Sequence, residues 1–233
     1  MVGALVGYVF KGITHKASDI VLAFAAGVSF AAAVLGLILP SVELGGEWGI
    51  PITVIGIFCG ALCVNLLERA VPFAYRIVGL DEGEGGGRVD KILLFVMAMA
   101  IHNLPEGIAA GVGFGTGDES MGILIALGIA IQNVPEGMVI ITPMLSAGIS
   151  KGKTLICALA TGLVEVIGTI LGYYAVTLAE FILPFSLAFA GGTMLYVVSH
   201  DMIPETHADG HCRAATYSLL SGFCLMLIFD ALL

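Results

Sequence analysis

The stretch Ile92–Phe114, ILLFVMAMAIHNLPEGIAAGVGF, decides the fold, because it is an apolar run long enough to cross a membrane. A helix of about 20 residues spans the roughly 30 Å of hydrocarbon in a bilayer. The ionisable residues of the stretch, His102 and Glu106, lie near its middle, and it contains no Lys, Arg or Asp. It therefore predicts a transmembrane helix with a polar centre.

The composition extends this conclusion to the whole chain. Of the 233 residues, 58% are hydrophobic and 12% are charged, and the mean hydropathy is +1.04. Soluble domains carry roughly 25% charged residues, so the values indicate an integral membrane protein. The net charge of −9 argues against a nucleic-acid-binding surface.

Similar apolar runs recur and predict an all-α integral membrane protein, an eight-helix transmembrane bundle forming a single domain over residues 1–233. The predicted helices are Val2–Thr14, Ala17–Leu39, Ile50–Val71, Ile92–Phe114, Met121–Ala147, Thr154–Leu178, Leu183–Ile203 and Ala214–Leu233. They fall into groups of three, two and three. A cytoplasmic linker at about residues 72–91, with the acidic, Gly-rich sequence GLDEGEGGGR, separates the first group from the pair.

The first predicted helix is short for a membrane span. A secretory signal is the alternative, but no basic residue precedes the run, and Lys11 and Lys16 follow it in place of a small-residue cleavage site. We interpret it as a genuine first helix, whose natural start can lie upstream of Met1.

The basic residues predict the orientation of the helices. With eight spans, all nine fall on one side of the membrane: Lys11, Lys16, Arg69, Arg76, Arg88, Lys91, Lys151, Lys153 and Arg213. The positive-inside rule makes this side cytoplasmic, so both termini are expected on the extracytoplasmic side.

A polar motif occurs in two consecutive predicted helices, as HNLPEG at residues 102–107 and as QNVPEG at residues 132–137. Consecutive spans run antiparallel, so the motifs form an inverted pair, an arrangement that typically places a binding site near the bilayer midplane. In the first motif His102 and Glu106 share a helix face, with Asn103 beside them. Pro105 and Pro135 each remove a backbone donor, which bends the helix and releases a carbonyl oxygen.

Three glutamates, Glu106, Glu136 and Glu165, lie in predicted spans that contain no Lys or Arg. Carboxylates in such a place are either protonated or face a cation. Imidazole and carboxylate ligands suit zinc and similar divalent metals, and weak amide ligands favour a site that releases its ion. The alternative is that both motifs are proline kinks whose polar side chains satisfy loosened backbone, although the repetition argues against it.

These motifs resemble a known family. HNLPEG, QNVPEG and the single glutamate of TGLVEVIG (Thr161–Gly168) are similar to the fourth, fifth and sixth helices of the ZIP family of divalent-metal transporters. The bacterial GufA-like branch fits best, because it pairs HNxPEG with QNxPEG. VVSHDMIPETH (Val197–His207) resembles the seventh helix of that branch, and the resemblance covers essentially the whole chain.

The resemblance implies zinc uptake across the inner (plasma) membrane by a multi-pass protein, often with tolerance for cadmium, iron or manganese. It also implies a homodimer and either an elevator-like or a rocking movement of the site. Matching positions would form a binuclear centre bridged by two glutamates. One metal would be bound by His102, Glu106, Gln132 and Glu136, and the second by Asn103, Asn133, Glu106, Glu136 and Glu165.

The chain also departs from the family pattern. Relatives of this branch often have Met where Ser29 stands in AAGVSF, which puts a thioether ligand in doubt, and often have Glu in place of Asp201. His200 and Asp201 are expected to act as ligands on the cytoplasmic release path, and His211 lies at the same end of the seventh helix. The His-rich cytoplasmic loop of many members is replaced by the acidic linker.

The predicted function is therefore transport of a divalent metal, most simply zinc, with no enzymatic activity and no catalytic cofactor. No nucleotide-binding motif is present, so neither nucleotide nor nucleic acid is expected as a partner. The alternative is an intramembrane zinc-dependent hydrolase with Glu106 as general base. The sequence lacks both HExxH and GxSxG, which argues against it.

Overall fold

A computed structural model of the chain describes residues 15–77, 88–146, 149–178, 180–208, 210 and 212–232, and every regular element in them is helical. The first predicted helix, Val2–Thr14, lies outside the described residues. The long segments are α2 (His15–Ala31) with η1 (Ala32–Ile38) and α3 (Leu39–Leu44), α4 (Gly49–Ile77), α5 (Arg88–Gly115), α6 (Glu119–Ser146), α7 (Lys151–Leu178), α8 (Leu183–Val197) with η4 (Val198–Met202) and α9 (Ile203–His207), and α10 (Cys212–Leu232). Two short 3₁₀ turns, η2 (Gly46–Trp48) and η3 (Glu180–Ile182), precede α4 and α8.

The described helices agree with a membrane bundle. Six segments are long and apolar enough to cross a membrane, and α5 is a further helix of 28 residues. Large apolar side chains point outward, among them Phe58 of α4, which is 72% exposed. In lipid such a surface carries no penalty, and a helix satisfies its own backbone hydrogen bonds. The eight-span count and the extracytoplasmic termini remain predictions.

Helical residues extend into both ends of the predicted linker at residues 72–91, whose cytoplasmic position remains a prediction. α4 continues to Ile77 and α5 already begins at Arg88. An apolar run marks where a chain crosses hydrocarbon, whereas a helix extends past it wherever polar residues tolerate helical geometry. The same reason explains why α7 starts at Lys151 and the α8–α9 segment extends to His207.

Two helical segments contain a widened π-turn that ends just before a proline. The N–H of Leu39 donates to Val34 O ahead of Pro40, and the N–H of Ile203 donates to Val198 O ahead of Pro204. Proline has no N–H for the regular i→i−4 bond, so the preceding turn takes the wider pattern. The second π-turn, η4, contains His200 and Asp201.

The two motif helices form a tight antiparallel pair, as predicted. α5 ends at Gly115 and α6 begins at Glu119, with a turn in which Gly117 has φ +80°. The N–H groups of Ser120 and Met121 donate to Asp118 Oδ1 at 2.9 and 3.2 Å, which caps the new helix.

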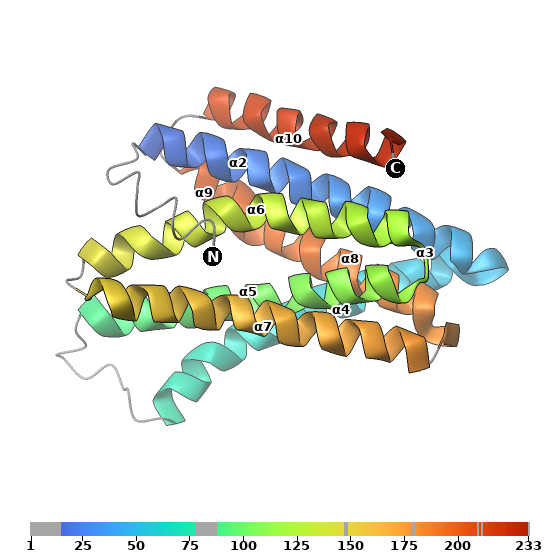
Figure 1. Cartoon of the computed structure of the whole chain (residues 1–233), viewed down its shortest axis with the longest axis horizontal. Helices are drawn as coiled ribbons and strands as arrows, with labels where there is room; N and C mark the ends of the chain where they lie inside the picture. Colours follow the sequence, from blue (N-terminus) through green and yellow to red (C-terminus); the bar gives the residue numbers. More distant parts are fainter. Residues whose placement is uncertain are drawn as a thin grey trace.

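The bundle can be followed in Figure 1 from α10 at one edge, through α2 and α6, to α5 and α7. The closest helix pairs are α5 with α7, α4 with α8, and α2 with α10. A side chain at Gly107 of α5 would collide with the Glu165 carbonyl, and one at Gly172 of α7 would collide with the Ile108 carbonyl. The two helices therefore approach each other closely at these glycines, and this approach sets the distance between the helices that carry Glu106 and Glu165.

Candidate metal centre

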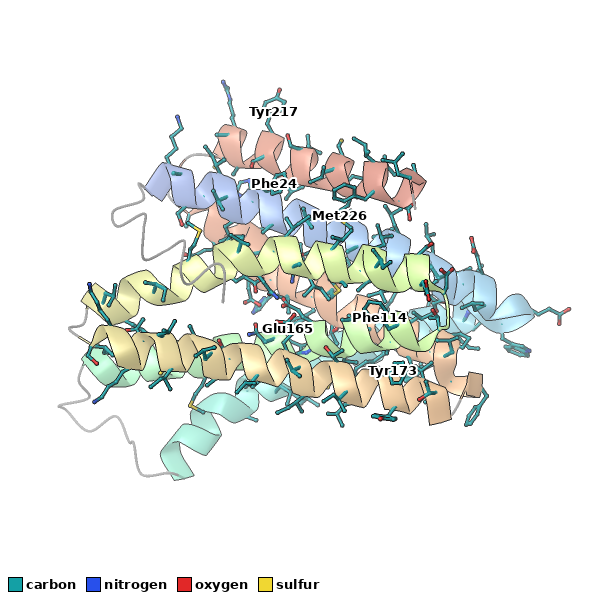
Figure 2. All side chains as sticks on the ribbon, in the orientation of Figure 1. Phe24, Phe114, Glu165, Tyr173, Tyr217 and Met226 are labelled. Carbon is teal, nitrogen blue, oxygen red and sulfur yellow. The ribbon has the colours of Figure 1, made fainter. Side chains whose placement is uncertain are left out.

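The predicted site residues come from three packed helices. α5 supplies Asn103 and Glu106, α6 supplies Gln132, Asn133 and Glu136, and α7 supplies Glu165, whose side chain is labelled near the middle of the bundle in Figure 2. His102 lies within α5, but its side chain is outside the described ones, and His211 is outside the described residues altogether.

Glu106 and Glu136 are the central acids of this arrangement. They are 3% and 9% exposed, and within the described structure the Oε2 atom of each is buried without a hydrogen-bond partner. The two carboxylates lie close enough for their charges to interact, and Glu165 adds to the repulsion. Buried acids with orphaned oxygens are unfavourable unless a proton or a cation accompanies them.

The side chains of Lys and Arg do not supply that cation in the part of the chain that the structure describes. All the described ones are exposed, namely Lys16, Arg69, Lys151, Lys153 and Arg213. Among the described residues, no Lys or Arg therefore neutralises the buried carboxylates, and the balancing positive charge is a proton or a bound cation.

The two asparagines are held by α7. Asn133 Nδ2 donates to both carboxylate oxygens of Glu165, at 2.9 Å each, and Asn103 Nδ2 donates to the Thr161 carbonyl at 2.9 Å. A carbonyl and a carboxylate only accept, so each amide must present its nitrogen to α7. Each amide oxygen is thereby turned away from these partners and is the atom left to bind a cation.

Gln132 lies in a different environment, facing α2. Its Oε1 atom pairs with the hydroxyl of Ser29, and both residues line a small cavity with Glu106 and Pro105. The cavity has room for about one water-sized occupant. Its remaining walls are apolar and come from α8 and η4: Met194, Val197, Val198 and Met202.

His200 and Asp201 lie in η4, the π-turn that contributes Val198 and Met202 to this cavity. His200 is exposed and Asp201 is half-buried. The structure thus places both on the segment beside the buried acids, without bringing the His200 side chain into the cavity.

The sequence did not predict a polar cluster that joins α4 to the segment α8–η4. Asn65 Nδ2 donates to Tyr196 Oη at 2.8 Å, and Tyr196 Oη donates to Glu68 Oε2 at 3.1 Å. The Tyr196 ring contacts the His200 ring in a tilted arrangement, with ring centroids 5.1 Å apart and an interplanar angle of 38°. The i,i+4 spacing of Tyr196 and His200 could have predicted the contact between these two side chains. The contacts of Tyr196 with α4 depend on tertiary packing and could not be predicted in this way.

The described side chains do not form a closed site of the structural zinc type. Among them, no three of His, Cys, Asp and Glu are close enough together to hold a metal. The predicted centre also includes His102 and three amides, which bind divalent metals weakly compared with thiolates. Such a set is suited to an ion that must leave again.

Comparison with known proteins shows what the whole chain is similar to. The family model described as ZIP Zinc transporter matches residues 81–230. The chain is 37% identical to the zinc transporter GufA of Myxococcus xanthus, over 98% of this chain and 92% of the relative. It is 36% identical to the zinc transporter ZIPB of Bordetella bronchiseptica, over 99% of this chain and 76% of the relative. It is 32% identical to the zinc transporter ZupT of Chlorobaculum parvum, over 97% and 90%.

Proposed function

We propose that this chain, which belongs to the ZIP family of zinc transporters, carries zinc into the cytoplasm through a two-metal site between α5, α6 and α7. It is a multi-pass membrane protein of the GufA-like branch, and it is a transporter rather than an enzyme. The direction of transport, the two-metal site and the residue roles are the parts that we propose.

One observation carries the proposal. Glu106 and Glu136 are buried at equivalent positions of two inverted motifs, and each keeps an oxygen without a hydrogen-bond partner among the described residues. A divalent cation between them offsets their mutual repulsion and their desolvation at the same time. Burial of the two carboxylates therefore favours binding of a cation that both of them contact.

The amide geometry supports a second ion. Glu165 lies beside Asn133, and Asn103 is anchored one turn earlier on α7 through Thr161. In our proposal Glu106 and Glu136 bridge the two ions. His102 and Gln132 complete the first position, and Asn103, Asn133 and Glu165 complete the second.

The charge distribution gives the predicted cytoplasmic side, and the position of η4 supports release of the ion on that side. We propose that His200 and Asp201 receive the ion on the cytoplasmic side, which is the side to which the positive-inside rule assigns all nine basic residues. Exposed His200 exchanges ligands with water readily. His211 belongs to the same release path in this proposal.

Selection among metals follows from the ligand chemistry. Carboxylate, imidazole and amide ligands accept zinc but also suit manganese, iron and cadmium. We propose zinc as the principal substrate, with cadmium, iron and manganese as weaker ones, and a homodimer as the working assembly. The exposed apolar side chains of α4, including Phe58 and Leu62, are available to lipid or to a second copy.

The alternative drawn from the sequence, an intramembrane zinc hydrolase, is not supported. The relatives that match over nearly the whole chain are all named as transporters.

The test is zinc flux into liposomes that contain the purified protein and a zinc-responsive dye. We expect flux from the intact protein, a reduction of at least about 100-fold in Glu136→Ala, because a buried ionic ligand is lost, and a clear reduction in His102→Ala. The control is Glu119→Gln, which removes an exposed acid at the start of α6 and should leave flux unchanged.

The outcomes separate two errors. Absence of zinc flux in the intact protein would show that the transport proposal is wrong. Normal flux in both Glu136→Ala and His102→Ala would leave transport standing and overturn the site assignment.

A further inference from the structure

Ser29 is a buried polar residue of α2, a helix that carries none of the proposed metal ligands. It is 2% exposed, and its Oγ lies 3.0 Å from the carbonyl oxygen of Ala25, one turn earlier on the same helix. The same Oγ pairs with Gln132 Oε1 of α6, a residue that is 1% exposed. Ser29 is thus the direct polar link between α2 and a proposed metal ligand.

The hydroxyl group cannot satisfy both oxygens at once. Ser29 has one hydrogen to donate, whereas Ala25 O and Gln132 Oε1 are both acceptors. A hydroxyl also accepts, and a glutamine amide carries an oxygen and an NH₂ group that exchange places when it turns over. Two complete hydrogen-bonding arrangements are therefore open to this pair.

In the first arrangement Ser29 donates to Gln132 Oε1, as in the structure. The amide NH₂ is then left for Glu106, which lines the same cavity. This arrangement suits a carboxylate that has no cation beside it, because the amide supplies the donor that the acid needs.

In the second arrangement Ser29 donates to Ala25 O and accepts from the Gln132 NH₂ group. The amide oxygen then faces the cavity and Glu106, where a cation requires an oxygen ligand and is repelled by N–H groups. Back-bonding of a serine to the carbonyl four residues earlier is common in helices, so this arrangement needs no change of backbone.

We propose that Ser29 is a positioning residue for Gln132, giving its amide a hydrogen-bond partner both when the oxygen faces Ser29 and when the oxygen faces the metal. This inference rests on the proposed function of the buried site. An alanine at position 29 would leave one end of the Gln132 amide unpaired in each arrangement. A small hydroxyl side chain can change from hydrogen-bond donor to acceptor toward Gln132 without moving its oxygen atom.

The position of Ser29 adds a consequence for transport. Because α2 supplies the partner and α6 supplies the ligand, the orientation of the ligand is sensitive to the relative position of these two helices. A displacement of α6 along α2 would break the link and release the amide. Loss of the Ser29 contact is therefore expected to weaken metal binding more than it slows the maximal rate.

The experiment is a double-mutant cycle in liposomes, with initial zinc flux measured against external zinc concentration. Ser29→Ala should raise KM about three- to ten-fold, the effect of one hydrogen bond, with a maximal rate within about two-fold of the intact protein. Ser29→Thr keeps the hydroxyl, so its KM should lie closer to that of the intact protein than the KM of Ser29→Ala does.

The decisive readout is the effect of Ser29→Ala in a Gln132→Ala background. If Ser29 acts through Gln132, the double variant has the KM of Gln132→Ala alone, because no amide is left to orient. A purely structural role for Ser29 would instead raise KM by the same factor in both backgrounds, and that result would overturn the proposal. An unchanged KM in Ser29→Ala would overturn it as well.

Two controls keep this test independent of folding and of the transport proposal. Each variant must elute as a single symmetric species in detergent, and Ser29→Gly, which removes the hydroxyl without adding a metal ligand, replaces Ser29→Ala if the latter misfolds. Absence of flux in the intact protein would refute the transport function itself. Normal flux with additive effects would refute only the role of Ser29.

Discussion

At the scale of single residues, the site is built by satisfying some polar atoms and leaving others open. The amide nitrogens of Asn103 and Asn133 are occupied by α7, whereas Glu106 Oε2 and Glu136 Oε2 have no hydrogen-bond partner in the described structure. The occupied atoms fix the ligands in place, and the open atoms supply the attraction for a cation. In a polar core without a binding role, all of these buried atoms would be expected to have hydrogen-bond partners.

Asn133 provides a test at this scale. Asn133→Ala removes the donor that holds both oxygens of Glu165, so Glu165 loses its fixed orientation. Outer hydrogen bonds of this kind contribute about 10- to 100-fold to metal affinity, and we expect zinc flux at low zinc to fall by at least about ten-fold. The measurement is flux in the liposome assay, with Thr177→Ala, an exposed hydroxyl of α7, as the matched control. Equal flux in the two variants would contradict the role of Asn133.

At the scale of helices, contact between α5 and α7 depends on glycines that meet backbone. Gly107 and Gly111 of α5 face the Glu165 and Thr169 carbonyls, and Gly168 and Gly172 of α7 face Leu104 and Ile108. Packing of this kind is the main source of helix association in lipid, where the hydrophobic effect between helices is absent. It also explains why Glu165 lies beside the motif of α5.

Two glycines of α7 provide a matched pair for this claim. A Cβ at Gly172 would collide with the Ile108 carbonyl, whereas nothing lies within 4 Å of a Cβ at Gly162. Gly172→Ala should therefore destabilise the protein by about 1–3 kcal/mol, and Gly162→Ala should be neutral or stabilise it by up to about 1 kcal/mol. The thermal midpoint of each purified variant in detergent gives the comparison. A similar midpoint for both variants would refute the close packing of α5 on α7.

Some features of the helices could be predicted from sequence and others could not. The antiparallel arrangement of the motif pair is a local pattern, and the structure confirms it. The π-turns before Pro40 and Pro204 were missed, because a proline within a helix permits a kink, a break or a widened turn. Which of these forms depends on the neighbouring helices.

At the scale of the whole molecule, the distribution of charge predicts the orientation in the membrane. Cys212, at the start of α10, is exposed and adjoins Arg213 on the predicted cytoplasmic side. In a variant with Cys212 as the single cysteine, a membrane-impermeant maleimide should label inside-out vesicles and spare right-side-out ones. Glu119→Cys in a cysteine-free background should show the reverse. Labelling of Cys212 from the outside alone would overturn the predicted topology.

The sequence by itself determined the membrane class, the antiparallel arrangement of the two motifs and the chemical types of the proposed ligands. These properties follow from composition and from spacing along the chain, because the length of an apolar run and the side chains within it do not depend on how the helices pack. Only the tertiary structure decided that Asn133 holds Glu165, that Asn103 binds the Thr161 carbonyl and that Ser29 of α2 contacts Gln132. These contacts join residues far apart in the chain, and they depend on how closely glycine-lined helices pack, which hydrophobic periodicity does not encode.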